Sequence, residues 1–292
     1  MGQGTNCWCD LHTHTTGSDG ALSPADLVEY AREKRLRAVA ICDHDTVSGA
    51  RSLYRAPDAS EGPEVLTPLL VKEVEVVPGV EINCYLEGRE VHILGYYVPF
   101  GKGPFQALLE KMQESREDRV FQTVRLLRDL GLPVEASRVM ELSTGDSVGR
   151  PHVAQAMVEK GYAASVKDAF ERYLGLGRPA YVERARLCPE EAVRAISSAG
   201  GVAVWAHPGT SDCLHLISDL VKEGLQGIEA FHPDHDRCMS EKCQDLASRY
   251  GLVVTGGSDF HGIGAGEGGD LGGTVVGYDV VEALRRLALA KR

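Results

Sequence analysis

Apolar and polar residues alternate along the chain in short blocks that are typical of strands and helices following one another. Apolar runs rich in valine, isoleucine and alanine predict strands near residues 6–12, 37–43, 74–82, 91–98, 201–206, 227–231 and 252–257. Apolar positions at helical spacing predict helices near residues 24–35, 189–199, 214–223, 239–250 and 279–290. Ser23 is expected to cap the first helix, with Pro24 as its first residue. The alternation predicts βα units, a mainly parallel sheet and an α/β fold.

The middle of the chain departs from this alternation. Residues 105–175 contain long helical patterns and no convincing strand, with apolar residues at helical spacing from Leu108 to Leu127 and a further helix expected at 151–160. We interpret this stretch as an insertion that selects the substrate. The expected organisation is a barrel formed by residues 6–100 and 185–292, with a helical insertion at 101–184.

Composition is typical of a globular protein, since 43% of the 292 residues are hydrophobic and 25% are charged. No apolar run approaches the roughly 18 residues that span a bilayer, and the first residues lack the basic and apolar segments of a secretory signal. We therefore expect a cytoplasmic protein without a membrane partner, whose eight cysteines are reduced.

The formal net charge of −11 limits the choice of partners. Proteins that grip long nucleic acid present a basic surface, so duplex DNA is not expected as a partner. A small polyanion can still bind if metal cations reverse the local field. The charge thus favours a small phosphorylated substrate, a nucleotide or the end of a short RNA, and the sequence indicates no oligomeric state.

Histidines and carboxylates gather where the predicted strands end. Residues two apart in a strand point the same way, so Asp10, His12 and His14 share one face of the first strand. Cys7 and Cys9 then point to the opposite face, which we expect to be the layer between sheet and helices. Taken alone, two histidines separated by one residue indicate either a metal site or a polar strand end.

Comparable residues recur at other strands. Their positions are Asp43, His44 and Asp45 after the second strand, Glu81 at the end of the third, His92 in the fourth, His207 after the fifth, and Asp259 and His261 after the last. Because the carboxyl ends of parallel barrel strands converge on one rim, the joint pattern predicts a metal centre. Nitrogen and oxygen donors without thiolate suit manganese, iron or zinc.

Taken in order, these motifs resemble those of the PHP (polymerase and histidinol phosphatase) family, from about residue 8 to 280. The motifs are His12-x-His14, Asp19-Gly20, Asp43-His44-Asp45, Pro78-Gly79-Val80-Glu81, Ala206-His207-Pro208 and Ser258-Asp259-Phe260-His261. Gly149-Arg150-Pro151-His152 resembles the branch that contains nucleoside 3′,5′-bisphosphate phosphatases and 5′-to-3′ exonucleases of short RNA.

The resemblance implies a distorted (β/α)7 barrel of the TIM-like type with a site for two or three divalent ions, manganese being favoured over iron or zinc. It implies one metal on His12, His14, Glu81 and Asp259, a second on Glu81, His92 and His207, and a third on Asp19, His44 and His261. Cys42 departs from the family pattern, in which threonine or serine is usual, and is expected just beneath the metals.

The expected chemistry is attack of a metal-bound hydroxide on a phosphate, because divalent ions acidify bound water and neutralise phosphate oxygens. A covalent intermediate is not required, because the attacking hydroxide comes from bound water. Asp19 and His235 are the catalytic candidates. We expect His235 to contact the phosphate or to donate a proton to the leaving oxygen, the alternative being an ordinary histidine of the rim.

Cationic side chains beyond the metals are expected to hold the phosphate. Arg150 and His152 begin a predicted helix, where free backbone N–H groups also favour an anion, although Arg150 could instead form a salt bridge within the insertion. Arg178, where the insertion returns to the barrel, is either a phosphate contact or a solvated loop residue.

These inferences predict a metal-dependent phosphoesterase that acts on a small phosphorylated nucleotide, a nucleoside 3′,5′-bisphosphate, and also on terminal nucleotides of short RNA. Two alternatives stay open. One is a phosphatase of the histidinol-phosphate type, against which the insertion and Arg150 argue. The other is a non-catalytic PHP module, against which the full set of ligand residues argues.

Overall fold

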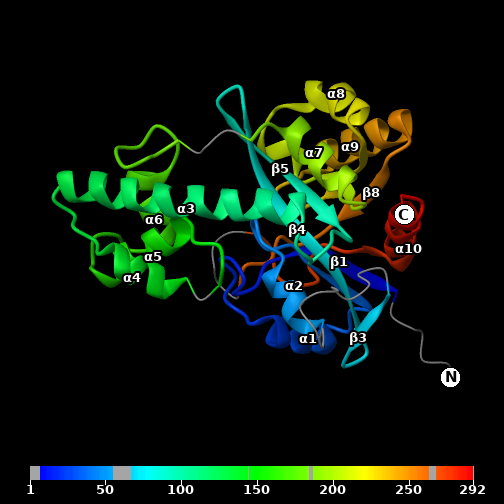
Figure 1. Cartoon of the computed structure of the whole chain (residues 1–292), viewed down its shortest axis with the longest axis horizontal. Helices are drawn as coiled ribbons and strands as arrows, with labels where there is room; N and C mark the ends of the chain where they lie inside the picture. Colours follow the sequence, from blue (N-terminus) through cyan, green and yellow to red (C-terminus); the bar gives the residue numbers. More distant parts are fainter. Residues whose placement is uncertain (1–6, 55–66, 144, 184–186, 263–267, 292) are drawn as a thin grey trace.

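A curved sheet wrapped by helices forms the body of the protein, and a group of helices projects from one side of it (Figure 1). The computed structural model describes residues 7–54, 67–143, 145–183, 187–262 and 268–291. Within these ranges, none of the helices has the length and apolar character needed to cross a membrane.

The strands and helices have the following bounds. The strands are β1 (Trp8–Thr13), β2 (Ala38–Ile41), β3 (Leu69–Val71), β4 (Val74–Leu86), β5 (Arg89–Tyr96), β6 (Val202–Trp205), β7 (Leu225–Phe231), β8 (Val253–Gly256) and β9 (Val276–Gly277). The helices are α1 (Pro24–Glu33), α2 (Ser48–Leu53), α3 (Pro104–Asp129), α4 (Ala136–Leu142), α5 (Arg150–Glu159), α6 (Val166–Ala169), α7 (Pro189–Ser198), α8 (Ile217–Lys222), α9 (Arg237–Tyr250) and α10 (Tyr278–Leu289). A π-helical turn, Phe170–Leu174, follows α6.

The strands form a single mixed sheet in the order β8-β7-β6-β5-β4-β2-β1-β9, with β3 added beside β4. Neighbours pair in parallel except at β5, β9 and β3. The two ends of the sheet approach each other after β8, where the His14 amide donates to the Phe260 carbonyl at 2.9 Å. The sheet is therefore a nearly closed barrel, as the fold expectation required.

Most predicted elements are present, and the differences concern short or irregular segments. The predicted strand 74–82 continues to Leu86 and forms a hairpin with β5, so Glu81 lies inside a strand and not at its end. The predicted helix 214–223 begins with a 3-10 turn before α8. The sequence analysis missed α2, β3 and β9, which have six, three and two residues and are too short to show a period.

Alternate residues of β2 separate the interior of the barrel from the outer layer. Val39 and Ile41 pack in the outer cluster, which includes the buried residues of α1. Ala40 and Cys42 pack in an interior cluster together with Cys9 and the buried face of α10, which contacts β1, β6 and β8. The expectation that Cys9 points into the sheet–helix layer was therefore wrong, because this side of β1 faces the inside of the closed barrel.

Helix α3 joins the barrel to the projecting helices. Its 26 residues span about 39 Å at 1.5 Å per residue. Phe105 and Leu109 near its start belong to the outer core of the barrel. Val124 and Leu127 near its end belong to a separate cluster formed by residues between Val120 and Ala180. The helical stretch thus has a hydrophobic core of its own, linked to the barrel by a shared helix.

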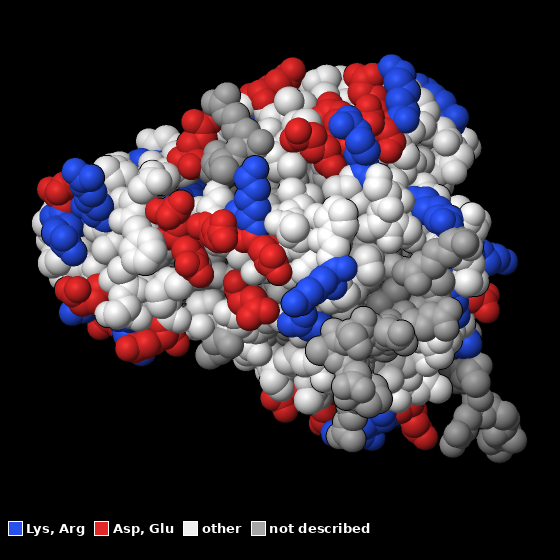
Figure 2. Space-filling model, in the orientation of Figure 1, with Lys and Arg blue, Asp and Glu red and all other residues white. Residues whose placement is uncertain are grey.

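Helix α3 carries charged side chains both on its exposed side and on its buried side. Glu110, Glu114 and Glu117 are exposed on one face, and Figure 2 shows acidic side chains gathered over this part of the molecule. Arg116 and Arg119 are buried on the face turned toward the rest of the protein. Two cationic side chains of α3 are thus directed inward, whereas Lys111, Arg125 and Arg128 are exposed.

Candidate metal centre

The structure brings together all nine residues that the sequence indicated as metal ligands. Three groups have ligand atoms within 4.8 Å of one another, and they share His14 and Glu81. The groups are His14, Asp19, His44 and His261; His12, His14, Glu81 and Asp259; and Glu81, His92 and His207. They agree with the three expected sets, except that His14 also joins the set around Asp19.

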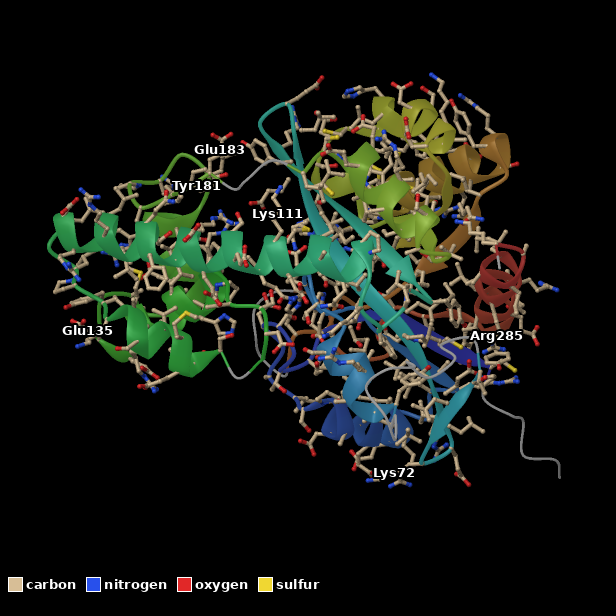
Figure 3. All side chains as sticks on the ribbon, viewed as in Figure 1. Lys72, Lys111, Glu135, Tyr181, Glu183 and Arg285 are labelled. Carbon is tan, nitrogen blue, oxygen red and sulfur yellow. The ribbon has the colours of Figure 1, made fainter. Side chains whose placement is uncertain are left out.

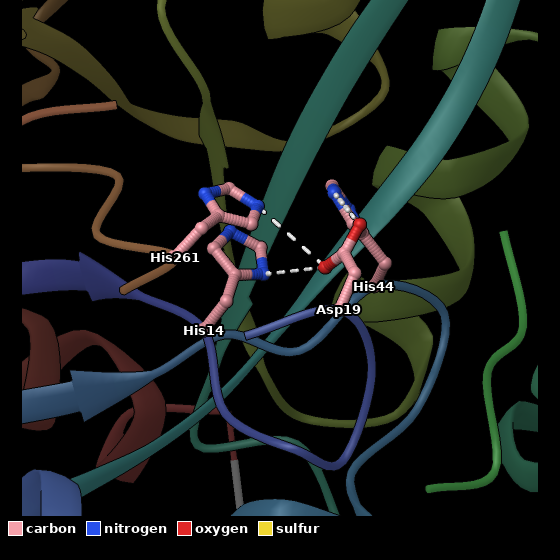
Figure 4. A group of neighbouring side chains, drawn as sticks. All are labelled: His14, Asp19, His44 and His261. Carbon is pink, nitrogen blue, oxygen red and sulfur yellow. Dashed lines mark ion pairs between the residues drawn. The ribbon is translucent and has the colours of Figure 1, made fainter. Parts of the chain in front are cut away.

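The group around Asp19 lies at the carboxyl ends of β1 and β2 (Figure 4). Asp19 Oδ1 lies 3.5 Å from His261 Nε2 and 4.0 Å from His14 Nδ1, while its Oδ2 lies 3.7 Å from His44 Nε2. The rings of His14 and His261 stack with centroids 4.1 Å apart. One carboxylate thus faces three imidazoles from three separate segments of the chain.

Glu81 occupies the centre of the whole cluster. Its side chain is 1% exposed, and its two oxygens lie 2.8–3.5 Å from nitrogens of five histidines: His12, His14, His44, His92 and His207. Strand β4 extends past Glu81 and pairs with β5, so the backbone at Glu81 is fixed by the hydrogen bonds of the sheet. Such a position suits a carboxylate that bridges two ions.

Backbone conformation at the rim is unusual where the ligands turn inward. Asp259 and His207 have φ angles of 52° and 26°, in the left-handed region that side chains other than glycine rarely adopt. Gly257 allows the two ends of the sheet to meet, because a Cβ there would lie 2.4 Å from the Cβ of His12. The strained backbone at Asp259 and His207 thus occurs where the ligand side chains come close together.

Hydrogen bonding shows that cations fit between these residues. His12, His207 and His261 each direct Nδ1 to a protein acceptor, namely Glu229 Oε1, Thr210 Oγ1 and the Asp259 carbonyl oxygen. In the neutral form that a metal ligand must adopt, their Nε2 atoms then carry lone pairs that face carboxylate oxygens at 3.0–3.5 Å. Two acceptors at such distances repel unless a cation lies between them.

The same conclusion follows from buried atoms without partners. Among the described residues, the buried ligand atoms that lack a hydrogen bond include His12 Nε2, His14 Nε2, Glu81 Oε2, His92 Nε2 and Asp259 Oδ1. Burying a polar atom without a partner costs about 1–3 kcal/mol, so five in one place require a common partner. The donors are nitrogen and oxygen only, which suits divalent manganese, iron or zinc.

Burial and mutual charge set the protonation of the cluster. Burial lowers the pKa of His14 to about 3, helped by the charges of His261 and His44, so His14 is neutral and able to donate a lone pair. Burial alone would raise the pKa of Glu81, but the charges of His92, His44 and His12 outweigh it and hold the pKa well below its usual range. The carboxylate is therefore ionised.

Several residues that support the ligands were missed by the sequence analysis. Glu229 is fully buried, accepts from His12 Nδ1 at 3.1 Å and also accepts from the His207 amide at 2.8 Å. It thereby fixes the ring that faces the metals, as second partners of ligating histidines commonly do. The available signal was a lone acidic residue in the apolar strand Leu225–Phe231.

A second support comes from the projecting helices. Arg116 on α3 donates from Nε to Asp45 Oδ2, and both side chains are buried. Asp45 also accepts from the Asn83 amide and side chain, while Asn83 Nδ2 lies 3.1 Å from His44 Nδ1. This connected set of bonds links α3 to a residue of the metal cluster.

A cavity of about 660 Å³ opens beside the cluster. His92 and His207 line it on the metal side, and Arg150 lines it farther away. Arg150 Nη2 donates to both oxygens of Glu90, at 2.9 and 3.1 Å. Arg150 therefore pairs with barrel strand β5 and not with an acidic residue of the insertion, and its guanidinium lies in the same cavity as two candidate ligands.

Comparison with known proteins decides the family. The chain matches the PHP domain over residues 10–183. The chain belongs to the PHP family. This assignment confirms the resemblance inferred from the ordered histidine and carboxylate motifs.

Curated members of the PHP family resemble this chain over most of its length. It is 35% identical to the phosphoribosyl 1,2-cyclic phosphate 1,2-diphosphodiesterase of Eggerthella lenta, over 87% of this chain and 94% of that protein. It is 34% identical to the 5′-3′ exoribonuclease Rnm of Salmonella typhimurium, over 86% and 84%. It is 31% identical to the 3′,5′-nucleoside bisphosphate phosphatase of Chromobacterium violaceum, over 91% and 90%.

A solved structure extends the match to three dimensions. The metal-dependent phosphoesterase of Bifidobacterium adolescentis superimposes with a TM-score of 0.82 at 28% identity, covering 96% of each chain. All of these PHP relatives are named for hydrolysis of phosphate esters. The expectation of a phosphoesterase with a TIM-like barrel and a metal-binding cluster is confirmed.

The remaining predicted site residues of this PHP protein occupy different settings. His152 is buried, accepts from the Gly149 amide through Nδ1, and has a pKa lowered by burial. Arg178 is exposed and does not line the described cavity. His235 accepts from the Gly209 amide at Nε2 and donates from Nδ1 to the Ala230 carbonyl. No ring N–H of His235 is thus directed at the cluster.

His232, which the sequence analysis did not favour, lies closer to the metal ligands. Its Nδ1 accepts from the Asp234 amide at 3.1 Å, so Nε2 carries the proton. This Nε2 lies 3.5 Å from Asp259 Oδ2, and the side chain is 1% exposed. His232 therefore supports the second oxygen of a candidate ligand. The sequence signal for His232 was its position directly after Phe231, the last residue of β7.

Proposed function

We propose that this protein is a metal-dependent phosphatase for a small nucleotide with two phosphates, a nucleoside 3′,5′-bisphosphate. The observation that carries the proposal is one cavity lined by both Arg150 and the candidate ligands His92 and His207. The Chromobacterium violaceum relative is named for this activity.

The spacing along β5 supports binding of two phosphates. Glu90, which holds Arg150, and His92 are two residues apart on β5, a separation of about 6.6 Å along a strand. A ribose places its 3′- and 5′-phosphates a comparable distance apart. A phosphate at the metal cluster would therefore leave the second phosphate within reach of Arg150. Arg119 also approaches Glu90, at 3.9 Å, so two guanidiniums share one carboxylate and keep a net positive charge.

The nine clustered residues would hold two or three divalent ions, and we propose manganese. When bound, such ions acidify a water nucleophile and neutralise the phosphate oxygens. The protein contributes the positions of the ligands: Glu229 and Thr210 orient His12 and His207, and Glu81 lies between the groups. We further propose that residues 101–184 select the substrate, since Arg150 reaches the cavity from this stretch.

A panel of phosphate esters tests the proposal. With manganese added, kcat/KM should be highest for adenosine 3′,5′-bisphosphate, compared with histidinol phosphate, an aryl phosphate, a ribose 1,2-cyclic phosphate and a short 5′-phosphorylated RNA. Preference for histidinol phosphate or for the cyclic ester would replace the proposed substrate. No hydrolysis of any ester would favour a non-catalytic role. Release of terminal nucleotides from the RNA would add exonuclease activity to the proposal.

Arg150→Ala tests the role of the second phosphate. A charge-assisted hydrogen bond contributes about 1.5–3 kcal/mol, so kcat/KM for the bisphosphate should fall about ten- to hundred-fold. Hydrolysis of the aryl phosphate should change little, because it has no second phosphate. Arg178→Ala, at an exposed position outside the cavity, should preserve both rates. An equal fall on both substrates in Arg150→Ala would assign Arg150 to the fold or the metal cluster.

A further inference from the structure

The cavity has aromatic and apolar side chains in its wall, in addition to the charged Glu87 and Arg89 at the turn between β4 and β5. Tyr85 on β4 and Tyr181 on the segment that returns from the insertion both line it, together with Leu176. Figure 3 shows Tyr181 on this returning segment, above α3. Leu176 is 66% exposed, an apolar side chain left in solvent at the cavity wall. These residues add a flat apolar surface to a site whose other end is polar.

Neighbouring groups hold the Tyr181 ring in place. The guanidinium carbons of Arg119 and Arg150 lie 5.6 and 5.7 Å from its centroid, within the range of cation–π attraction. Burial raises the pKa of the Tyr181 phenol, and the nearby Glu90 and Tyr85 raise it further, so the phenol stays neutral. The ring is thus a neutral aromatic surface beside the arginine proposed to bind phosphate.

The size of the cavity exceeds what a phosphate needs. Ligand sites commonly have volumes of about 300–1,000 Å³, with apolar walls and a few polar anchors. A cavity of about 660 Å³ lined by two candidate metal ligands, by Arg150 and by two tyrosines suits a ligand with two anionic groups and a flat ring. Nucleobases stack on aromatic side chains with little dependence on base identity.

We infer that Tyr181, with Tyr85 beside it, forms a stacking surface for the base of the nucleotide substrate. This inference rests on the proposed function and deepens it: the base contributes to recognition, and different bases are accepted with similar efficiency. The leaving nucleoside occupies the cavity, with its second phosphate on Arg150 and its base on Tyr181.

Kinetics with and without the base test the inference. The substrates are adenosine 3′,5′-bisphosphate and the abasic 1-deoxyribose 3,5-bisphosphate, which has the same phosphates. Tyr181→Ala should lower kcat/KM for the nucleotide about five- to 150-fold and leave the abasic ester unchanged. Tyr181→Phe should retain wild-type values because the ring is kept. Phe121→Ala removes an exposed aromatic side chain of α3 outside the cavity and should change neither rate.

Binding of a fluorescent base separates this inference from the proposed activity. Stacking should quench 2-aminopurine riboside 3′,5′-bisphosphate on wild-type protein, on Tyr181→Phe and on Phe121→Ala, but not on Tyr181→Ala. Quenching without phosphate release would keep the base site and reject the phosphatase. Equal loss of kcat/KM on both esters in Tyr181→Ala, or quenching that persists in that variant, would overturn the stacking role.

Discussion

The buried pair of Arg116 and Asp45 gives the most direct test of the link between α3 and the metal cluster. The side chains are 6% and 2% exposed, and Arg116 Nε donates to Asp45 Oδ2. Arg116→Ala would leave the Asp45 carboxylate buried with only the two donors of Asn83 among the hydrogen bonds described here. Removing one partner of a buried ion pair costs about 3–5 kcal/mol, and the two surviving bonds place the loss near the lower value, about 3 kcal/mol.

Urea unfolding followed by tryptophan fluorescence measures this loss, because Trp205 is buried in the barrel. Arg138→Ala is a matched control: Arg138 is 44% exposed and pairs with Glu159 and Glu141, so its removal should cost less than about 1 kcal/mol. Both variants remove one guanidinium from the same helical region, so only burial distinguishes them.

A second substitution measures the cost of leaving the Asp45 carboxylate without Arg116. Asp45→Asn in the Arg116→Ala background should recover part of the stability, because the uncompensated carboxylate is removed. Strict additivity of the two changes would show that the residues do not interact. A loss in Arg116→Ala no larger than that in Arg138→Ala would refute the argument from burial.

Other expected outcomes concern the cluster and its surroundings. Glu81→Ala should reduce the expected two or three ions per chain, measured by elemental analysis of protein prepared without chelator; full metal content with full activity would remove the bridging role. Cys7→Ser with Cys9→Ala should keep the metals but cost about 1–3 kcal/mol in urea unfolding, since Cys9 is buried; metal loss would indicate thiolate ligands. His235→Ala should preserve the shape of the pH–rate profile, since both its ring nitrogens bond to backbone; loss of the basic limb would restore it as proton donor.

The sequence allowed prediction of those site residues whose position follows from local periodicity. His12 and His14 share a strand face, and both approach Asp259, as residues two apart should. The alternation of side chains along a strand does not show which of its two faces becomes the inside of a barrel, because that depends on how the sheet closes. Strict alternation also fails between Cys9 and His12, because the pairing of β1 with β2 is irregular between Asp10 and Thr13.

Supporting contacts escaped prediction because they join distant segments. His12 and Glu229 are 217 residues apart, and Asp45 and Arg116 are 71 apart. Asp45 belongs to a motif named from the sequence, and Glu229 is the lone acidic residue of an apolar strand, but neither pattern shows which distant side chain is its partner. Only the folded arrangement shows that these charges are neutralised by a particular partner.

The position of the helical stretch between β5 and β6 has a consequence for folding. These strands pair directly, with Tyr96 opposite Val202, although residues 97–201 separate them in the chain. Closing a flexible loop of this length costs about 4 kcal/mol of chain entropy. Helices that gather first around their own apolar cluster shorten the effective loop before the strands meet. Helix α3 contributes side chains to both cores, so this early assembly would also present a preformed apolar surface to the barrel strands. The helical stretch would then assist closure of the sheet.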